Sequence, residues 1–174
     1  GALPALRQMQ QEGLLTAIGI GVNEIEVSLA TLRQADIDVI LLAGRYTLLE
    51  QRALAELLPA CESRRVSVVV GGPYNSGALA GGDHYDYAAM PTAIADRVRR
   101  LEAVCRRFDV PLPAAALQFP LAHPAVAAVI PGARSAAELD ANLDHLARPV
   151  PNALFHALKE EGLLHPEAPI PEAH

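Results

Sequence analysis

Glycine-rich segments follow the apolar runs of this 174-residue sequence, and they are well suited to bind a ligand. The segment Gly71-Gly72-Pro73-Tyr74-Asn75-Ser76-Gly77 carries three glycines and a proline. Such a loop lets the backbone approach a ligand closely, and its N–H groups can hold a pyrophosphate. Residues 131–135 precede a segment whose apolar residues recur at the spacing of an α-helix, and a helix N-terminus attracts anions. Neither segment matches GxGxxG or a Walker loop, so a purely structural role for these glycines remains open.

Polar and aromatic side chains in the other loops are a second group of candidates. Asn23 follows the first apolar run, where it suits both a helix N-cap and a cofactor contact. Arg45 and Tyr46 follow the second run, either as substrate contacts or as loop packing. His84 and Tyr85 begin the sequence HYDY, which suits an active site or a mobile loop with aromatic anchors. No Ser/His/Asp or Cys/His arrangement stands out among them.

Strand-like apolar runs alternate with helix-period segments along the chain. We expect strands at residues 16–21, 38–42, 66–70 and 126–130. Continuous apolar runs are typical of strands buried on both faces, as in a parallel sheet covered by helices. The loops after parallel strands meet at one edge of the sheet, so the candidate residues are expected there.

Capping residues and apolar periodicity predict the helices. Asn23 with Glu26, and Ser135 with Glu138, have the three-residue spacing of a capping box. A helix beginning at Pro91 carries a stripe of apolar side chains at helical spacing. That stripe is Ile94, Val98, Leu101, Cys105 and Phe108.

Further helices are expected at both ends of the chain and between the strands. The first carries Leu3, Leu6 and Met9 on one face and ends at Gly13. Others are expected over residues 54–61, 111–121 and 151–164. Another follows Ser135, and its apolar residues are Leu139, Leu143 and Leu146. His123 is expected in a turn, and residues 166–174 are expected to form a loose tail of this single domain, residues 1–174.

Composition excludes several classes of protein. The net charge of −6 and the scattered arginines argue against a nucleic-acid-binding face. No apolar run approaches the ~18 residues that would span a membrane, and no signal peptide is recognised. Cys61 and Cys105 form neither a disulfide framework nor a zinc motif, so we expect no metal site. They suit a reducing compartment, and we expect a cytoplasmic protein.

Long stretches of the sequence resemble the aldo/keto reductase family. QEGLLTAIGIGVNE is similar to its fifth-strand region, VVVGGPYNSGALAG to its seventh-strand cofactor loop, and VIPGARSAAELDANL to its eighth strand and following helix. VPLPAAALQFPLAHPAVAAVIPGARS and LKEEGLLHPEAPIP resemble the subgroup of D-threo-aldose 1-dehydrogenases, L-fucose dehydrogenases and pyridoxal 4-dehydrogenase-like enzymes. The resemblance implies a (β/α)8 TIM barrel, of which these 174 residues would be the C-terminal half, strands five to eight. A complete barrel has about 250 residues.

The same resemblance implies a nicotinamide cofactor at the C-terminal face of the barrel. Asn23 resembles the residue that binds the nicotinamide carboxamide, and the loop from Gly72 to Leu79 would wrap the pyrophosphate. Residues 132–135 would lie along the adenosine ribose, and Asn142 would bind the adenine. The implied cofactor-binding residues are Asn23, Gly71, Gly72, Pro73, Tyr74, Ser76, Gly77, Leu79, Gly132, Ala133, Arg134, Ser135, Glu138 and Asn142. Arg45, Tyr46, His84 and Tyr85 would shape the substrate mouth.

The expected activity is NAD(P)-dependent oxidation of an aldose at C1 to the lactone, or reduction of a related carbonyl, without a metal. A carboxylate at Glu138 favours a free ribose hydroxyl, and hence NAD over NADP, whereas Arg134 could pair with a 2′-phosphate. The family's catalytic Asp, Tyr, Lys and His come from the first four β/α units. No catalytic residue is therefore assigned, and the chain alone is expected to be inactive.

Two other interpretations remain open. The chain could be a non-catalytic, nucleotide-binding half-barrel. Its two exposed sheet edges would then favour assembly with a copy or with a separate N-terminal chain. An unrelated, flavodoxin-like small sheet that binds a nucleotide is the third interpretation.

Overall fold

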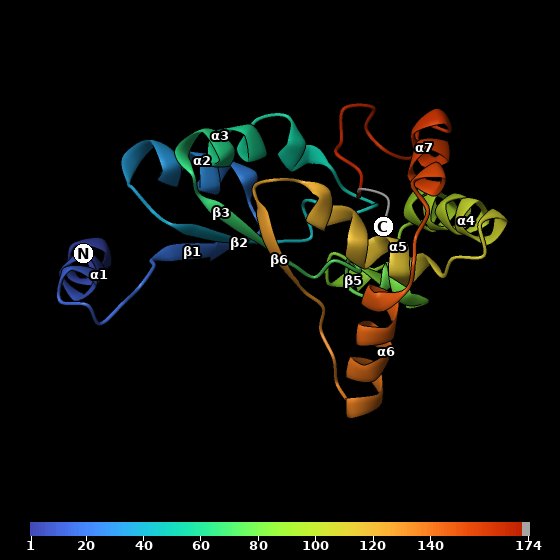
Figure 1. Cartoon of the computed structure of the whole chain (residues 1–174), viewed down its shortest axis with the longest axis horizontal. Helices are drawn as coiled ribbons and strands as arrows, with labels where there is room; N and C mark the ends of the chain where they lie inside the picture. The colour runs from blue at the N-terminus through green and yellow to red at the C-terminus, as the bar shows by residue number, and fades with distance from the viewer. Residues whose placement is uncertain (172–174) are drawn as a thin grey trace.

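A four-stranded parallel sheet forms the centre of the structure, a computed structural model that describes residues 1–171 (Figure 1). The order is β1-β2-β3-β6, and every neighbouring pair is parallel. The strands are β1 Gly19–Val22, β2 Val39–Ala43, β3 Ser67–Gly71 and β6 Val126–Ile130. The predicted α/β class with a parallel sheet is therefore confirmed.

Three strands begin later than predicted, and the shift is largest in β1. The Ile18 N–H donates to the Asp38 carboxylate at 2.9 Å, and the Asp38 N–H donates to the Ile18 carbonyl at 2.8 Å. These bonds hold the segment before Gly19 at the sheet without making it part of the ladder. A Cβ on Gly19 would lie 2.0 Å from the Val39 carbonyl oxygen, so only glycine fits where β1 begins.

Seven α-helices and three short 3₁₀ turns occur within residues 1–171. The helices are α1 Ala2–Gln11, α2 Ile25–Gln34, α3 Leu57–Arg64, α4 Thr92–Arg107, α5 Leu112–Gln118, α6 Ala136–Ala147 and α7 Asn152–Glu160. The 3₁₀ turns are η1 Arg52–Leu54, η2 Ala78–Ala80 and η3 Phe119–Ala122. The helix expected over 111–121 is divided into α5 and η3 because Pro120 lacks an N–H for the helical ladder.

One of the two expected capping boxes forms a cap. The Ser135 hydroxyl accepts a hydrogen bond from the Glu138 N–H at 3.2 Å and so caps α6. The cap predicted at Asn23 is wrong, because α2 begins one residue later with Glu24 as its N-cap residue and no side-chain cap. Asn23 instead follows β1 directly, and its carbonyl accepts a bond from Arg45.

Helices cover one face of the sheet, and α2 and α3 lie together on that side in Figure 1. The side chains of Ile40, Leu42 and Val68 are fully buried on this face. Side chains alternate along a strand, and on the other face Leu41 is 40% exposed and Ile130 53% exposed. The expectation of a sheet buried on both faces is therefore wrong for the described residues, where small and apolar side chains line an open face.

The apolar stripes of the helices differ in burial. On α4, Leu101 and Cys105 are fully buried, as their spacing predicted. On α6, by contrast, the stripe of three leucines is 44–56% exposed. The exposed residues are Leu139, Leu143 and Leu146. Helix α1 has no buried residue and lies apart at the β1 end (Figure 1).

The segment after α7 and the long loop after β3 are more ordered than the sequence suggested. Ala168 is 1% exposed in the core, and the Lys159 ammonium donates to the Pro166 carbonyl at 2.8 Å. The loose tail expected from residue 166 is therefore wrong for residues 166–171, and residues 172–174 lie outside the described range. The long loop contains a hairpin of β4 His84–Tyr85 and β5 Ala88–Ala89 that was not predicted.

Two further properties hold within residues 1–171. No helix there is both long enough and apolar enough to cross a bilayer. The same residues contain no group of three or more His, Cys, Asp or Glu side chains arranged to hold a metal ion.

Candidate functional site

A small pocket lies where β2 and β3 end, at the edge of the sheet at which the four predicted loops begin. Its volume is about 30 Å³, which is room for one part of a ligand. It is lined by Ala43, Gly44, Gly72, Asn75, Ser76, Asp86 and Tyr87. Ligands of open parallel sheets bind outside the carboxyl ends of the strands, so this pocket marks the candidate site. A larger cavity, of about 390 Å³ beside Asp38 and Arg65, opens at the opposite end.

The glycine-rich loop after β3 reverses direction through a series of left-handed residues. Gly72, Asn75, Ser76 and Gly77 have φ values of 56°, 49°, 59° and 97°. A Cβ on Gly72 would meet nothing within 4 Å, so open space adjoins the backbone there. Side-chain-bearing residues at such φ values persist only when their surroundings hold them.

A buried pair of polar side chains provides that support. The Thr47 hydroxyl donates to the Asn75 side-chain oxygen at 2.6 Å, and the Asn75 amide donates to the Gly44 carbonyl at 3.2 Å. The Thr47 oxygen also accepts from the Leu49 N–H at 3.2 Å. Thr47 is fully buried and Asn75 is 5% exposed. The loops after β2 and β3 are thereby joined beneath the pocket, through two residues that the sequence did not single out.

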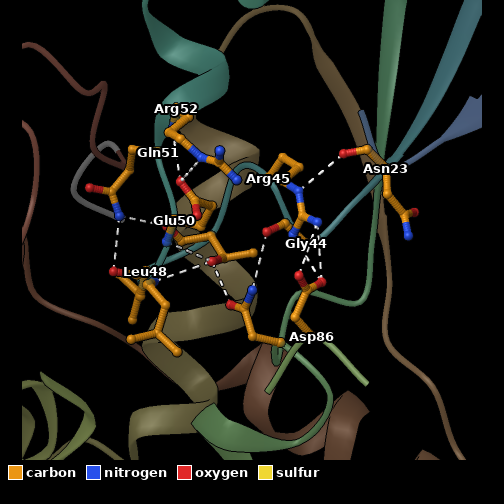
Figure 2. A network of polar contacts seen from close by, with 11 residues as sticks. Asn23, Gly44, Arg45, Leu48, Glu50, Gln51, Arg52 and Asp86 are labelled. Atoms are coloured by element: carbon orange, nitrogen blue, oxygen red, sulfur yellow. Dashed lines mark hydrogen bonds and ion pairs between the residues drawn. The ribbon is translucent and has the colours of Figure 1, made fainter. Parts of the chain in front are cut away.

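Arg45 connects three loops, as Figure 2 shows, and one of its partners, Asp86, lines the pocket. Its Nε donates to the Asn23 carbonyl at 3.0 Å, and its Nη1 and Nη2 donate to the Asp86 carboxylate at 3.1–3.3 Å. The Arg45 side chain is only 14% exposed. The ends of β1 and β2 and the hairpin after β3 are therefore held by one guanidinium.

Tyr46 points into the core, unlike its neighbour Arg45. Its ring is fully buried and lies 5.2 Å from the Phe119 ring and 5.6 Å from the His123 ring, measured between centroids. Burial raises the pKa of the Tyr46 hydroxyl and lowers the pKa of His123. His123 accepts a bond from the Ala125 N–H at 3.1 Å, which confirms the expected turn. The position of Tyr46 favours the packing interpretation over substrate contact.

The HYDY segment reaches the pocket through its second half. His84 is exposed and pairs with Asp83 at 2.6 Å, and Tyr85 packs partly buried against the core. Asp86 and Tyr87 form the tip of the hairpin and line the pocket. The Tyr87 N–H donates to the Ser76 hydroxyl oxygen at 3.0 Å. The structure therefore brings Asp86 and Tyr87 to the site instead of His84 and Tyr85.

The residues expected along the adenosine lie around the start of α6. The Glu138 carboxylate accepts from the Arg134 N–H at 2.7 Å and from the Arg134 guanidinium at 3.0 Å. These bonds, the backbone one above all, lower the pKa of Glu138. Asn142 is 8% exposed, and its oxygen accepts from the Tyr74 hydroxyl at 2.8 Å. Burial raises the pKa of Tyr74 to about 12, so that it stays a neutral donor.

The remaining expected residues differ in accessibility. Gly132 and Ala133 are exposed between β6 and α6, and a Cβ on Gly132 would meet nothing within 4 Å. Gly71, Pro73 and Leu79 are buried, so that Pro73 and Leu79 shape the loop by packing.

Comparison with known proteins identifies the family of the chain. The model of the aldo/keto reductase family matches residues 2–161. The chain belongs to the aldo/keto reductase family. It is 42% identical to D-threo-aldose 1-dehydrogenase of a Pseudomonas species and 39% identical to pyridoxal 4-dehydrogenase of Microbacterium luteolum, each over 168 residues. These matches cover 94% of the chain but 51% and 49% of the relatives, so the chain spans about half of their length.

Solved structures of the family have the same fold. Aldo-keto reductase AKR11C1 from Bacillus halodurans, in its holo form, superposes with a TM-score of 0.68 at 28% identity. The match covers 98% of this chain and 57% of that one. Glycerol dehydrogenase AKR11B4 from Gluconobacter oxydans is similar in fold, with a TM-score of 0.68 at 18% identity, 97% coverage of this chain and 55% of its own.

Proposed function

We propose that this chain is the cofactor-binding part of an NAD(P)-dependent oxidoreductase that oxidises an aldose at C1 to the lactone, or reduces a related carbonyl. The observation that carries the proposal is the 42% identity to a D-threo-aldose 1-dehydrogenase over 94% of the chain. The pocket and the glycine-rich loop at the carboxyl edge of the sheet support it.

The donors around the pocket suit a nicotinamide dinucleotide. Within residues 1–171 the hydrogen bonds of Asn23 come from its backbone, which leaves its carboxamide available to a nicotinamide amide. The Ser76 oxygen accepts from Tyr87, which leaves its proton available to a phosphate. Open space adjoins Gly72 and Gly132, where the backbone can approach the pyrophosphate and the ribose. When bound, the nicotinamide would supply a hydride-accepting or hydride-donating C4.

The charges around the adenosine end favour NAD over NADP. Glu138 is ionised at neutral pH, and it already binds both the backbone N–H and the guanidinium of Arg134. The pair presents no unpaired positive charge to a 2′-phosphate, while a carboxylate can accept from a ribose hydroxyl. Asn142, oriented by Tyr74, is the proposed adenine contact.

The open face of the sheet supports the proposal that the chain is the C-terminal half of a (β/α)8 barrel, with β1, β2, β3 and β6 as its strands five to eight. Leu41 and Ile130 would face the barrel interior, and the leucine stripe of α6 would pack on the N-terminal half. The acid/base residues would come from that half, and the chain alone would be inactive. The proposed partner is therefore its own N-terminal half, and a second copy is the alternative.

Calorimetric titration of the chain with NADH and NADPH tests the binding function directly. We expect NADH to bind more tightly than NADPH, and turnover of NAD with aldoses only in the complete gene product. Binding without turnover in the complete gene product would favour the non-catalytic, nucleotide-binding alternative. Absence of binding by both dinucleotides would refute the proposal.

A further inference from the structure

Arg45 is a partly buried guanidinium whose nitrogens all donate within the protein. Nε donates to a backbone carbonyl, that of Asn23, at 3.0 Å. Nη1 and Nη2 donate to the Asp86 carboxylate at 3.1–3.3 Å. Forked arginine–carboxylate pairs fix geometry as well as adding energy, and lysine does not reproduce them. This use of its donors favours a role in holding other residues over direct contact with a substrate.

The hairpin tip that Arg45 holds has an unfavourable backbone conformation. Asp86 and Tyr87 have φ values of 50° and 66°, although neither is glycine. A two-residue turn with both φ values positive matches the twist of a hairpin, yet Asn-Gly or Gly is its usual sequence. The tip is tied at two points, by Arg45 to Asp86 and by Ser76 to the Tyr87 N–H. These ties place Tyr87, which is 76% exposed, among the residues that line the pocket.

At the end of β1, the Arg45 guanidinium binds the backbone carbonyl of Asn23 and leaves the Asn23 side chain available. Figure 2 shows the Asn23 carbonyl directed to Arg45 and the Asn23 carboxamide turned away from it. Arg45 therefore fixes the backbone at the end of β1, from which the Asn23 carboxamide extends.

We propose that Arg45 is a positioning residue for the nicotinamide end of the site, which fixes Asn23 and the Asp86–Tyr87 tip relative to each other. The inference rests on the proposed cofactor-binding function. It assigns to Arg45 a role through Asn23 and the hairpin, in place of the substrate contact that the sequence suggested.

The test compares two ligands that differ only at the nicotinamide end. NADH and ADP-ribose are titrated calorimetrically into the whole chain, as wild type, Arg45→Lys and Asp86→Asn. The Arg45→Lys chain is expected to bind NADH about tenfold more weakly, because a lysine ammonium cannot keep both the Asn23 carbonyl and the forked Asp86 contacts, with less than a twofold change for ADP-ribose. Arg52→Lys is the matched control. The Arg52 side chain is 65% exposed, forms an ion pair with Glu50 at a distance of 2.9 Å, and does not line the pocket. The Arg52→Lys chain is expected to bind both ligands as wild type does.

Amide hydrogen exchange without ligand provides a second measurement. The Tyr87 and Met90 N–H groups, which donate to Ser76 and to the Asp83 carbonyl, are expected to lose protection in Arg45→Lys and Asp86→Asn but not in Arg52→Lys. Unchanged protection, or equal weakening of NADH and ADP-ribose, would overturn the role of Arg45. A wild-type chain that binds neither ligand would instead refute the proposed function, and hydrogen exchange would still show whether Arg45 holds the tip.

Discussion

Replacing Thr47 by valine tests whether the buried Thr47–Asn75 contact holds the loops beneath the pocket. Valine keeps the shape of threonine but removes the hydroxyl, which donates to Asn75 at 2.6 Å and accepts from the Leu49 N–H at 3.2 Å. The Glu50 N–H also donates to that hydroxyl, yet it keeps a bond to the Thr47 carbonyl at 3.2 Å. Two polar groups, the Asn75 oxygen and the Leu49 N–H, are therefore left without this partner beside a fully buried position.

The expected loss of stability follows from those two groups. A buried group left without a partner costs roughly 1–3 kcal/mol, so Thr47→Val should lower the free energy of unfolding by roughly 2–6 kcal/mol. Thr47→Ser is the matched control, because it keeps the hydroxyl and loses one methyl group, at a cost of about 1 kcal/mol. Urea unfolding followed by far-ultraviolet circular dichroism measures both variants against the wild type.

The difference in unfolding free energy between Thr47→Val and Thr47→Ser decides whether the hydroxyl matters. If the network holds the loops, the valine variant is the less stable of the two, although it buries more apolar surface. A valine variant as stable as the serine variant would show that the hydroxyl does not matter, and the argument for this network would be wrong.

Three further substitutions test the rest of the site. Burial lowers the pKa of His123 below its usual value, so at pH values below about 6.5 the unfolded chain binds more protons than the folded chain, and stability falls as the pH is lowered. His123→Gln should flatten this acid-side fall in urea titrations at several pH values. Tyr74→Phe removes the donor to Asn142 and should lower the free energy of unfolding by about 1 kcal/mol, as thermal or urea unfolding would detect. Glu138→Gln frees the Arg134 guanidinium from its carboxylate and should raise the affinity for NADPH relative to NADH; an unchanged ratio in calorimetry would contradict the charge argument.

Much of the sheet could be predicted from the sequence because four apolar runs lie between turn residues. The beginning of β1 could not, since the Asp38 carboxylate takes the Ile18 N–H that a strand pattern assigns to the ladder. The open face could not be predicted either. Apolar runs such as that around Leu41 have the same pattern whether a second layer covers them within this chain or not.

Some local features of the candidate site could be predicted from the sequence. The glycine-rich loop and the cap at Ser135 are recognisable from local sequence, because each depends on neighbouring residues. The pairs Thr47–Asn75 and Arg45–Asp86 join residues 28 and 41 positions apart, and no local pattern records such contacts. The hairpin was missed because its two-residue turn, Asp86–Tyr87, lacks the glycine that usually marks one.

The two buried cysteines make the chain its own reporter of local opening. Cys61 on α3 and Cys105 on α4 are both free and fully buried, and burial raises the pKa of each thiol to about 11. A thiol so shielded and so weakly acidic reacts with an alkylating reagent only after its helix has moved away. The labelling rates of Cys61 and Cys105 would therefore time the opening of these two helices separately, without any added probe.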